Sequence, residues 1–233
     1  MIIHGFQKMT LLDYPGRVAC TIFTAACNLR CPFCHNAGLV TRMDAAERID
    51  EAEILAYLKK RQGILDGVCI TGGEPTLQRD LADFIRKIKA IGYDVKLDTN
   101  GTNPALLAAL IDEGLLDYVA MDIKNTPEKY AATVGAPSFD VTPIQQSIDL
   151  LLTGRVDFEF RTTVVAEYHT PEDIGEIARR LCGAPRYFIQ PFVDSGNLIG
   201  SSDGQLHAPD AATLDRMCCA ARVTIPATVL RGA

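Results

Sequence analysis

The sequence has no tryptophan, no lysine- or arginine-rich run and no long apolar run. Hydrophobic residues make up 48% and charged residues 22% of its 233 residues, as in folded globular proteins and unlike disordered or fibrous ones. Because the formal net charge is −6 and no basic segment stands out, we expect no nucleic-acid partner. Lys8, Asp13 and Pro15 interrupt the amino-terminal residues, so we expect no secretory signal, no membrane span and a cytoplasmic location.

Three of the eight cysteines, Cys27, Cys31 and Cys34, fall within the segment CNLRCPFCHN. No fourth cysteine follows within thirty residues, although structural zinc sites and ordinary iron-sulfur sites are usually closed by four protein ligands. A long chain without an export signal indicates reducing conditions, in which clustered thiols favour a metal over disulfides. Either another ligand comes from elsewhere, or one metal position is left open. The alternatives are a zinc site or three unconnected buried thiols.

Short β-branched runs alternate with helical patterns along the sequence. Strands are expected at 18–24, 67–73, 93–101, 118–124, 156–165 and 186–192. Helices are expected at 50–63, 78–91, 104–114, 141–154 and 170–183, followed by a last helix at 209–222 and a last strand at 223–232. This alternation predicts repeated βαβ units with a parallel sheet, two units short of an eight-stranded barrel. We therefore predict a single α/β domain over residues 1–233, a partial (β/α)6 TIM-like barrel.

Two helix starts carry their own signals. Thr170 is followed by Pro171, and Asn103 by Pro104. A side chain that caps the first turn, with proline at the first helical position, is typical of a helix N-terminus. We therefore expect Thr170 and Asn103 to be N-cap residues.

The cysteine segment follows the first expected strand, at the sheet edge where α/β proteins place their active sites. A 4Fe-4S cluster held by three thiolates has one iron without a protein ligand, and that iron can chelate an amine and a carboxylate. The next strand ends in TGGEP, where Gly72 and Gly73 allow a ligand to approach the backbone and Glu74 offers a carboxylate to an ammonium group. The alternative for TGGEP is a turn before a helix that begins after Pro75.

Together the two motifs resemble the radical S-adenosylmethionine (SAM) superfamily, whose signature is CxxxCxΦC with an aromatic Φ, followed by a GGE motif. The resemblance implies a barrel of the radical SAM type, a 4Fe-4S cluster and S-adenosyl-L-methionine as cofactors, and reductive cleavage of SAM to a 5'-deoxyadenosyl radical that removes a hydrogen atom. It implies that Cys27, Cys31 and Cys34 hold the cluster. It also implies cofactor contacts from Phe33, Gly72, Gly73 and Glu74.

The framing segments LLDYPGRVACTIFTAACNLRCPFCHN and VTIPATVLRG resemble the activating proteins of anaerobic ribonucleoside-triphosphate reductase, over most of the chain. The strings CHN, DTNG and DIK also resemble the pyruvate formate-lyase activases. The resemblance implies that the partner is the reductase, a glycyl-radical protein, and that an electron donor such as flavodoxin or ferredoxin serves the cluster. The sequence departs from these relatives at Ala25-Ala26, where a glycine usually precedes the first cysteine.

By the same resemblance, Asp98 and Thr99 lie near the ribose or methionine end of the cofactor, and Met121 and Asp122 join them around a monovalent cation. The alternative for Asp98 is that it caps the turn at Asn100-Gly101.

Four further polar residues have two interpretations each. Arg161, Thr162 and Gln190 either point into the barrel and contact the cofactor or are satisfied polar residues of the core. Lys124 pairs either with a substrate carboxylate or, as is more common, with a neighbouring acidic side chain.

The remaining cysteines are expected to be non-ligands. Cys20 and Cys69 lie in apolar strands and are read as small buried hydrophobes. Cys218 and Cys219 are adjacent on a helix, so they face different directions and do not form a second cluster site.

The leading hypothesis is an activase that abstracts hydrogen from a glycine of the reductase. A chain of 233 residues leaves little room for a separate substrate domain, which favours a protein substrate. The alternatives are an activase of the pyruvate formate-lyase type, a radical SAM enzyme that acts on a small molecule, as a deazapurine synthase does, and a non-enzymatic iron-sulfur electron carrier.

Overall fold

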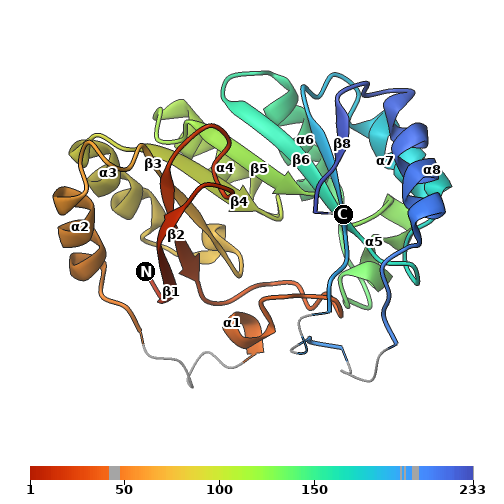
Figure 1. Ribbon diagram of the computed structural model, residues 1–233, viewed down its shortest axis with the longest axis horizontal. Coiled ribbons are helices and arrows are strands. Elements are labelled where there is room, and N and C mark those ends of the chain that lie inside the picture. Colours follow the sequence, from red (N-terminus) through yellow and green to blue (C-terminus); the bar gives the residue numbers. More distant parts are fainter. Residues whose placement is uncertain (42–47, 195, 197, 201–204, 233) are drawn as a thin grey trace. The chain divides into compact units, whose positions relative to one another are not determined.

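The computed structural model describes residues 1–41, 48–194, 196, 198–200 and 205–232 (Figure 1). The chain forms two compact units. The first unit comprises Met1–Asn28, Gly38–Ala120 and Arg155–Asp157, and the second comprises Leu29–Ala37, Met121–Gly154 and Phe158–Ala233. Because the units alternate along the chain, neither is a continuous segment, and the expectation of a single domain stays a prediction.

The first unit contains β1 (Ile3–Thr10), β2 (Ala19–Thr24), β3 (Gly67–Gly72), β4 (Asp94–Thr99) and the first residues of β5 (Tyr118–Asp122). Its helical segments are α1 (Ala37–Thr41), α2 (Glu51–Lys60), the 3-10 helix η1 (Pro75–Leu77), α3 (Leu81–Ile91) and α4 (Pro104–Asp112). β1 is antiparallel to β2, whereas β2, β3 and β4 are parallel in that order. β3 lies between β2 and β4, and its first four residues are buried, in agreement with their apolar sequence.

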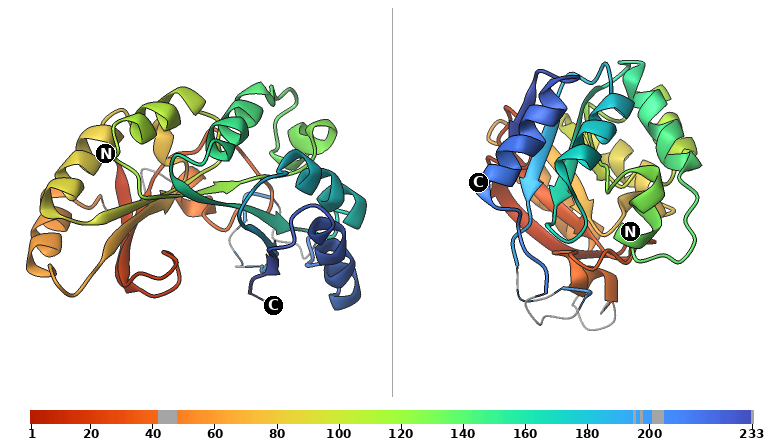
Figure 2. Two further views of the ribbon diagram at one scale, coloured as in Figure 1. Left: turned by 90° about the horizontal axis from the view of Figure 1, so that it is seen from above. Right: turned by 90° about the vertical axis from the view of Figure 1, so that its right-hand side faces the viewer.

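The second unit contains the end of β5 and the strands β6 (Asp157–Val164), β7 (Tyr187–Pro191) and β8 (Thr228–Leu230), which are parallel. Its helices are α5 (Pro127–Thr133), α6 (Thr142–Leu152), α7 (Pro171–Arg180) and α8 (Ala211–Arg222). Helices α2, α3 and α4 of the first unit lie on one side of its strands, and so do α6, α7 and α8 of the second unit relative to their own strands (Figure 2). None of the helices in the described ranges has the length and apolar character needed to cross a bilayer.

The order of the strands follows the sequence from β1 to β8, an open α/β arrangement among the described residues. All six expected strands of the repeating units are present, and so are the expected helices. Three elements, β1, α1 and α5, were not expected from the sequence. The expected strand at 223–232 is shorter, because Val223 still caps α8 and only Thr228–Leu230 pair with β7.

Both expected helix caps are confirmed. The Asn103 side chain accepts a hydrogen bond from the Leu106 N–H at 3.2 Å. Thr170 forms a capping box with Asp173: the Asp173 N–H donates to Thr170 Oγ1 at 3.3 Å, and the Thr170 N–H donates to the Asp173 carboxylate at 2.8 Å. Such caps satisfy amide groups that the helix itself leaves without partners.

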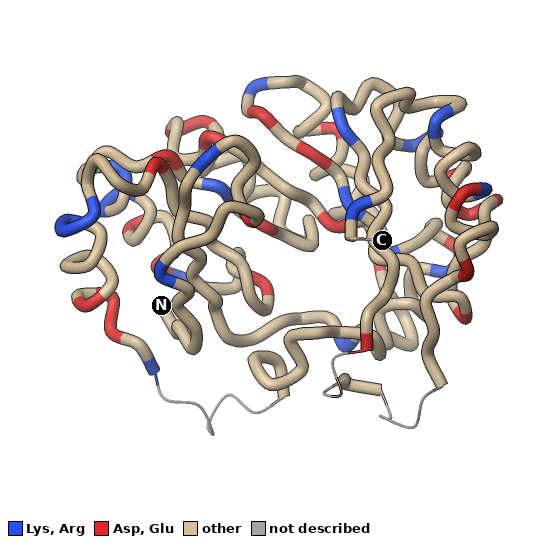
Figure 3. Tube along the Cα trace, in the orientation of Figure 1, with Lys and Arg blue, Asp and Glu red and all other residues tan. Residues whose placement is uncertain are grey.

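Charged residues of both signs are interspersed over the helices of each unit (Figure 3). On the first unit, Arg86 pairs with Glu113 at 2.7 Å and Lys89 with Asp117 at 2.7 Å. Pairs at this level of exposure contribute little to stability individually. In the candidate site the Lys96–Asp98 pair differs from these because the Lys96 side chain is buried.

Candidate active site

The end of β3 is joined to the loop that follows β2. The Gly73 N–H donates to the Thr24 carbonyl at 2.8 Å, and the Glu74 N–H donates to the Ala26 carbonyl at 2.7 Å. A Cβ atom on Gly72 would lie 2.4 Å from the Thr24 oxygen, and one on Gly73 would lie 1.9 Å from the Ala26 oxygen. Glycine is therefore required at both positions by this backbone contact, which holds the GGE segment against the loop that leads to Cys27.

Ala26 lies in the left-handed region, with φ of +71°, and it is the one non-glycine residue with positive φ in the described part of the chain. A side chain costs about 1 to 2 kcal/mol in this conformation, which glycine adopts freely. The departure from the glycine of the relatives thus falls on a position whose backbone suits glycine. The hydrogen bond from the Ala26 N–H to the Leu39 carbonyl at 3.0 Å helps to hold the conformation.

The Glu74 carboxylate is fully buried and accepts four hydrogen bonds. The donors are the Thr76 N–H at 3.0 Å, the Thr76 hydroxyl at 2.6 Å, the Thr99 hydroxyl at 2.8 Å and the Asn100 N–H at 2.6 Å. Burial raises the pKa of Glu74 above its ordinary value, although these hydrogen bonds oppose the shift. The carboxylate therefore ties the ends of β3 and β4 together. Its expected contact with the methionine ammonium group stays a prediction.

The residues that follow β4 extend this network to the first cysteine. Asn100 Nδ2 donates to Asn28 Oδ1 at 2.9 Å and lies 3.9 Å from Cys27 Sγ, within hydrogen-bond range for sulfur. Thr99 is buried, and its hydroxyl also accepts from the Gly101 N–H at 3.1 Å. Sequence analysis missed Asn100. Its place in DTNG, directly after two expected site residues, was the available signal.

Asp98 is paired with Lys96, two residues earlier on β4. Cys69 on β3 contacts both side chains, with Sγ 3.8 Å from Asp98 Oδ1 and 3.7 Å from Lys96 Nζ. Cys69 is buried as expected, but its thiol belongs to a polar cluster and is not simply a small hydrophobe. For Cys20 the simple reading fits, because burial raises the pKa of its thiol to about 12.

In the second unit, the last two cysteines of the motif lie on a short turn. The Cys34 N–H donates to the Cys31 carbonyl at 3.1 Å, and Cys31 is buried. The ring of Phe33 is also buried, with its centroid 5.8 Å from that of Tyr168 and 6.4 Å from that of His169. The aromatic residue of the motif thus anchors the cysteine turn in a packed cluster. A cofactor contact of Phe33 stays a prediction.

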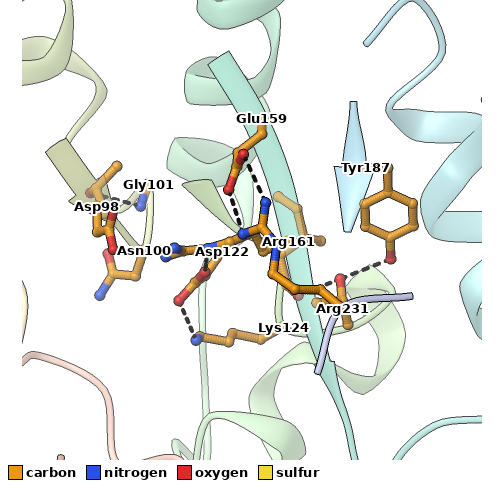
Figure 4. Close-up of polar contacts among 12 residues, drawn as sticks. Asp98, Asn100, Gly101, Asp122, Lys124, Glu159, Arg161, Tyr187 and Arg231 are labelled. Carbon is orange, nitrogen blue, oxygen red and sulfur yellow. Dashed lines mark hydrogen bonds and ion pairs between the residues drawn. The ribbon is translucent and has the colours of Figure 1, made fainter. Parts of the chain in front are cut away.

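Asp122, at the end of β5, is held between two cations (Figure 4). Arg161 Nε donates to Oδ1 at 2.8 Å, and Lys124 Nζ donates to Oδ2 at 3.1 Å. Burial alone would raise the pKa of Asp122, but the charges of Arg161 and Lys124 outweigh burial and hold the pKa well below its usual range. Of the two interpretations of Lys124, the pair with a neighbouring acidic side chain is observed.

The remaining expected site residues of the second unit have fewer described contacts. Met121 is fully buried in β5. Gln190 is half-buried on β7, opposite Thr163 of β6. Their roles toward a cation and the cofactor stay predictions.

The donor set suits an iron-sulfur cluster. None of the eight cysteines, all of which lie in the described part of the chain, forms a disulfide. Asn100 is within hydrogen-bond range of Cys27 in the first unit, and the charge of Lys124 interacts with that of Cys31 in the second. A donor and a cation favour the thiolate form that binds metal. Among the described residues, no three or more His, Cys, Asp and Glu side chains are placed together to hold a metal ion. Cys27 belongs to the first unit, and Cys31 and Cys34 belong to the second.

Comparison with known protein families identifies the family to which the chain belongs. The profile of the Radical SAM superfamily matches residues 21–181, which include the cysteine motif and the GGE segment. The chain therefore belongs to the radical SAM superfamily, whose enzymes use a 4Fe-4S cluster and S-adenosyl-L-methionine. The protein is accordingly a radical SAM enzyme.

Three relatives are informative. A Methanocaldococcus jannaschii protein assigned as a glycyl-radical enzyme activating enzyme is 34% identical over 82% of this chain and 80% of its own length. A Pyrococcus abyssi protein assigned as GTP 3',8-cyclase is 34% identical over 56% of this chain, but only 42% of the cyclase is matched. The pyruvate formate-lyase-activating enzyme of Listeria monocytogenes is 33% identical over 55% of this chain and 55% of its own.

The fold is also found in solved structures. The crystal structure of Streptococcus suis SuiB matches 91% of this chain with a TM-score of 0.69 and 16% sequence identity. The match spans 49% of SuiB. At this identity the likeness concerns the fold, and it agrees with the α/β partial barrel of the radical SAM type.

Proposed function

We propose that the protein is a glycyl-radical enzyme activase whose substrate is a glycine of anaerobic ribonucleoside-triphosphate reductase. The observation that carries the proposal is the similarity to the M. jannaschii activating enzyme, which extends over four-fifths of both chains. The match to the cyclase covers less than half of that protein and therefore supports the shared radical SAM chemistry more than a shared substrate. The choice of the reductase as the partner is supported by the resemblance of the segments at 11–36 and 223–232 to the activating proteins of that reductase.

Three ligands would hold the cluster: Cys27, Cys31 and Cys34. When bound, the cluster supplies one electron, and S-adenosyl-L-methionine supplies the group that removes a hydrogen atom from the substrate. The chain itself holds the thiolates. Asn100 donates to Cys27, and Lys124 opposes the negative charge of Cys31. Phe33 fixes the turn between the last two ligands through its buried ring.

The GGE segment would bind the methionine end of the cofactor. The Gly73 and Glu74 N–H groups are hydrogen-bonded to the loop before Cys27, so the backbone of this segment is already in one fixed conformation. Glu74 keeps that conformation by accepting four hydrogen bonds. A preorganised backbone loses little entropy when the cofactor binds. In this proposal Asp98, Thr99, Arg161 and Gln190 line the rest of the cofactor site.

The test uses the anaerobically reconstituted protein, the reductase with deuterated glycines, S-adenosyl-L-methionine and dithionite. We expect a glycyl radical signal on the reductase and deuterium in the 5'-deoxyadenosine that forms. The matched control is Cys34→Ala, which should give neither. If 5'-deoxyadenosine forms without deuterium while added GTP is consumed, the substrate is a small molecule.

The identity to the Listeria enzyme gives a second candidate, an activase of the pyruvate formate-lyase type. The two activases differ only in partner, so a competition assay separates them. With both glycyl-radical proteins present in equal amounts, our proposal expects the radical on the reductase. Reduced flavodoxin or ferredoxin in place of dithionite tests the electron donor, and a protein that only carried electrons would release no 5'-deoxyadenosine.

A further inference from the structure

The first unit contains a buried lysine in the middle of a strand. Lys96 lies on β4, and its side chain is 2% exposed. The strand register places Thr21 of β2 opposite Cys69 of β3, and Cys69 opposite Lys96. Side chains opposite one another in adjacent strands share a face of the sheet, so these three form one buried row. A lysine in such a place needs a partner, because an isolated buried ammonium group is strongly disfavoured.

The partner of Lys96 is Asp98, one of the residues expected at the cofactor. Lys96 Nζ donates to Asp98 Oδ1, and it also lies 3.7 Å from Cys69 Sγ. Asp98 accepts from Cys69 as well, at 3.8 Å. The negative charge of Asp98 is therefore balanced inside the first unit by a cation of the chain.

Asp122, the other charged residue expected to bind the cation, also has its negative charge balanced within its own unit. Asp122 carries one negative charge and contacts two cations, Arg161 at 2.8 Å and Lys124 at 3.1 Å. Each of the two carboxylates thus has at least one protein cation. A monovalent metal cation is attracted by uncompensated negative oxygen ligands, and the repulsion from a fixed ammonium group opposes its binding. These residues do not fit the monovalent cation that the formate-lyase activases suggest.

We propose that Lys96 takes the place of a monovalent cation: its ammonium group is a built-in counter-ion that positions Asp98 toward S-adenosyl-L-methionine, so cofactor binding requires neither potassium nor sodium. The proposal rests on the cofactor site described above. Lys96 is a positioning residue, because it acts on the cofactor through Asp98. Cys69 adds a further hydrogen bond to the same carboxylate.

The first experiment uses the unaltered, reconstituted protein. The dissociation constant of S-adenosyl-L-methionine is measured in potassium, sodium and tetramethylammonium chloride, each at about 100 mM so that screening is equal. We expect the three constants to agree within about twofold, which is near the precision of such comparisons. Binding that needs potassium or sodium would overturn the proposal. A protein with a full cluster and no cofactor binding in any salt would instead overturn the assignment of the cofactor site.

The second experiment uses Lys96→Met, which keeps the length of the side chain and removes its charge. In tetramethylammonium chloride we expect cofactor affinity to fall by about tenfold or more, because Asp98 loses its counter-ion. Potassium or sodium should restore most of that loss. A merely structural lysine would show no rescue by a cation, so an affinity that is low in all three salts, or unchanged in all three, contradicts the proposal.

Two controls keep the test specific. Lys89→Met removes a lysine that pairs with Asp117 at 2.7 Å, outside the expected site in the same unit, and should behave as the parent in every salt. The double variant Lys96→Met/Asp98→Asn removes both charges, so it should fold without a buried unpaired carboxylate and should show no cation rescue. Rescue that persisted in the double variant would place the cation elsewhere and overturn the role of Asp98.

Discussion

The Glu74 carboxylate accepts a hydrogen bond from the Asn100 N–H at 2.6 Å, which joins residues 26 positions apart at the ends of β3 and β4. The same Asn100 reaches Cys27 through its side-chain amide. One buried carboxylate therefore connects the GGE segment with the residue that donates to the first cysteine of the motif. Changes at Glu74 should be felt at both places.

Replacing Glu74 with Gln should lower the free energy of unfolding by about 1 to 3 kcal/mol, because one acceptor oxygen becomes an NH2 group that faces N–H and O–H donors. S-adenosyl-L-methionine should bind more weakly, whereas the iron content of reconstituted protein should stay that of the parent. Urea unfolding and cofactor titration measure the two effects. Glu53→Gln, on the exposed face of α2, is the control and should change neither. If the parent and Glu74→Gln bound the cofactor with equal affinity, Glu74 would have only a structural role in the loop and would not contact the cofactor.

Replacing Gly73 with Ala should displace the loop before Cys27, because the new Cβ would lie 1.9 Å from the Ala26 oxygen. We expect a loss of at least about 2 kcal/mol in the free energy of unfolding, together with lower iron content after reconstitution. Gly175→Ala in α7 is the control, since its nearest neighbour would be Ala220 Cβ at an ordinary 3.5 Å. That control should be neutral or slightly stabilising. A Gly73→Ala protein with parental stability would mean that the loop can move without cost.

Replacing Ala26 with Gly should stabilise the protein. The left-handed conformation of Ala26 costs about 1 to 2 kcal/mol, and the greater freedom of glycine in the unfolded chain takes back about 0.4 to 1 kcal/mol. We therefore expect a net gain of up to about 1.6 kcal/mol in the free energy of unfolding, measured with urea. Ala25→Gly, at the buried neighbour without positive φ, should instead destabilise. A loss of stability in Ala26→Gly would contradict the strain at this position.

The pattern of the sequence was sufficient for the repeating part of the fold. Buried parallel strands appear as apolar runs, and the helices between them have clear caps, so the six central strands and Thr170 and Asn103 could be predicted. β1 was not predicted because it is antiparallel and half-exposed, and its sequence IHGFQKMT is not an apolar run. α5 escaped because its seven residues, PEKYAAT, show no amphipathic period of useful length.

The site could be predicted only as far as residue type and spacing reach. The cysteine motif and the GGE segment are contiguous, so spacing identified them. The four donors to Glu74 come from two segments about 25 residues apart, which no local pattern reveals. Lys96 was missed because a lysine in a strand usually faces solvent, whereas its burial depends on a carboxylate two residues later and on the row formed with Cys69.

His169 should make stability depend on pH. Its Nδ1 lies 3.1 Å from the Val165 nitrogen and 3.3 Å from the Val165 carbonyl oxygen, and its Nε2 lies 2.7 Å from the Lys124 carbonyl oxygen. Burial lowers the pKa of His169 and outweighs the hydrogen bonds to the Lys124 and Val165 carbonyls, which favour the protonated ring. Below about pH 6.5 the unfolded state binds a proton at His169 that the folded state does not bind. The contribution of His169 to stability is therefore present above that pH and is lost as the pH falls.

The measurement is urea unfolding of the parent and His169→Gln between pH 8 and pH 5. The variant should be less stable at pH 8, because it loses the hydrogen bonds of the imidazole ring to Val165 and Lys124. It should nevertheless lose less stability than the parent when the pH is lowered. Burial also lowers the pKa of His35, which both proteins contain, so the variant should keep a part of the acid sensitivity of the parent. Equal slopes in the two proteins would show that His169 titrates normally in the folded state.

The cysteines divide into ligands and bystanders, and iron content separates them. Cys31→Ala should lose most of the about four irons per chain of a 4Fe-4S cluster and should not cleave S-adenosyl-L-methionine, because two thiolates do not hold the cubane. Cys218→Ser/Cys219→Ser should keep both. Cys218 is buried and Cys219 is exposed on α8, so the two thiols face different directions and cannot chelate one metal together. The variants are compared after identical anaerobic reconstitution, by iron analysis and by the release of 5'-deoxyadenosine. Full activity in Cys31→Ala would overturn the ligand assignment, and a loss of about four irons in the double variant would place the cluster, or a second one, at α8.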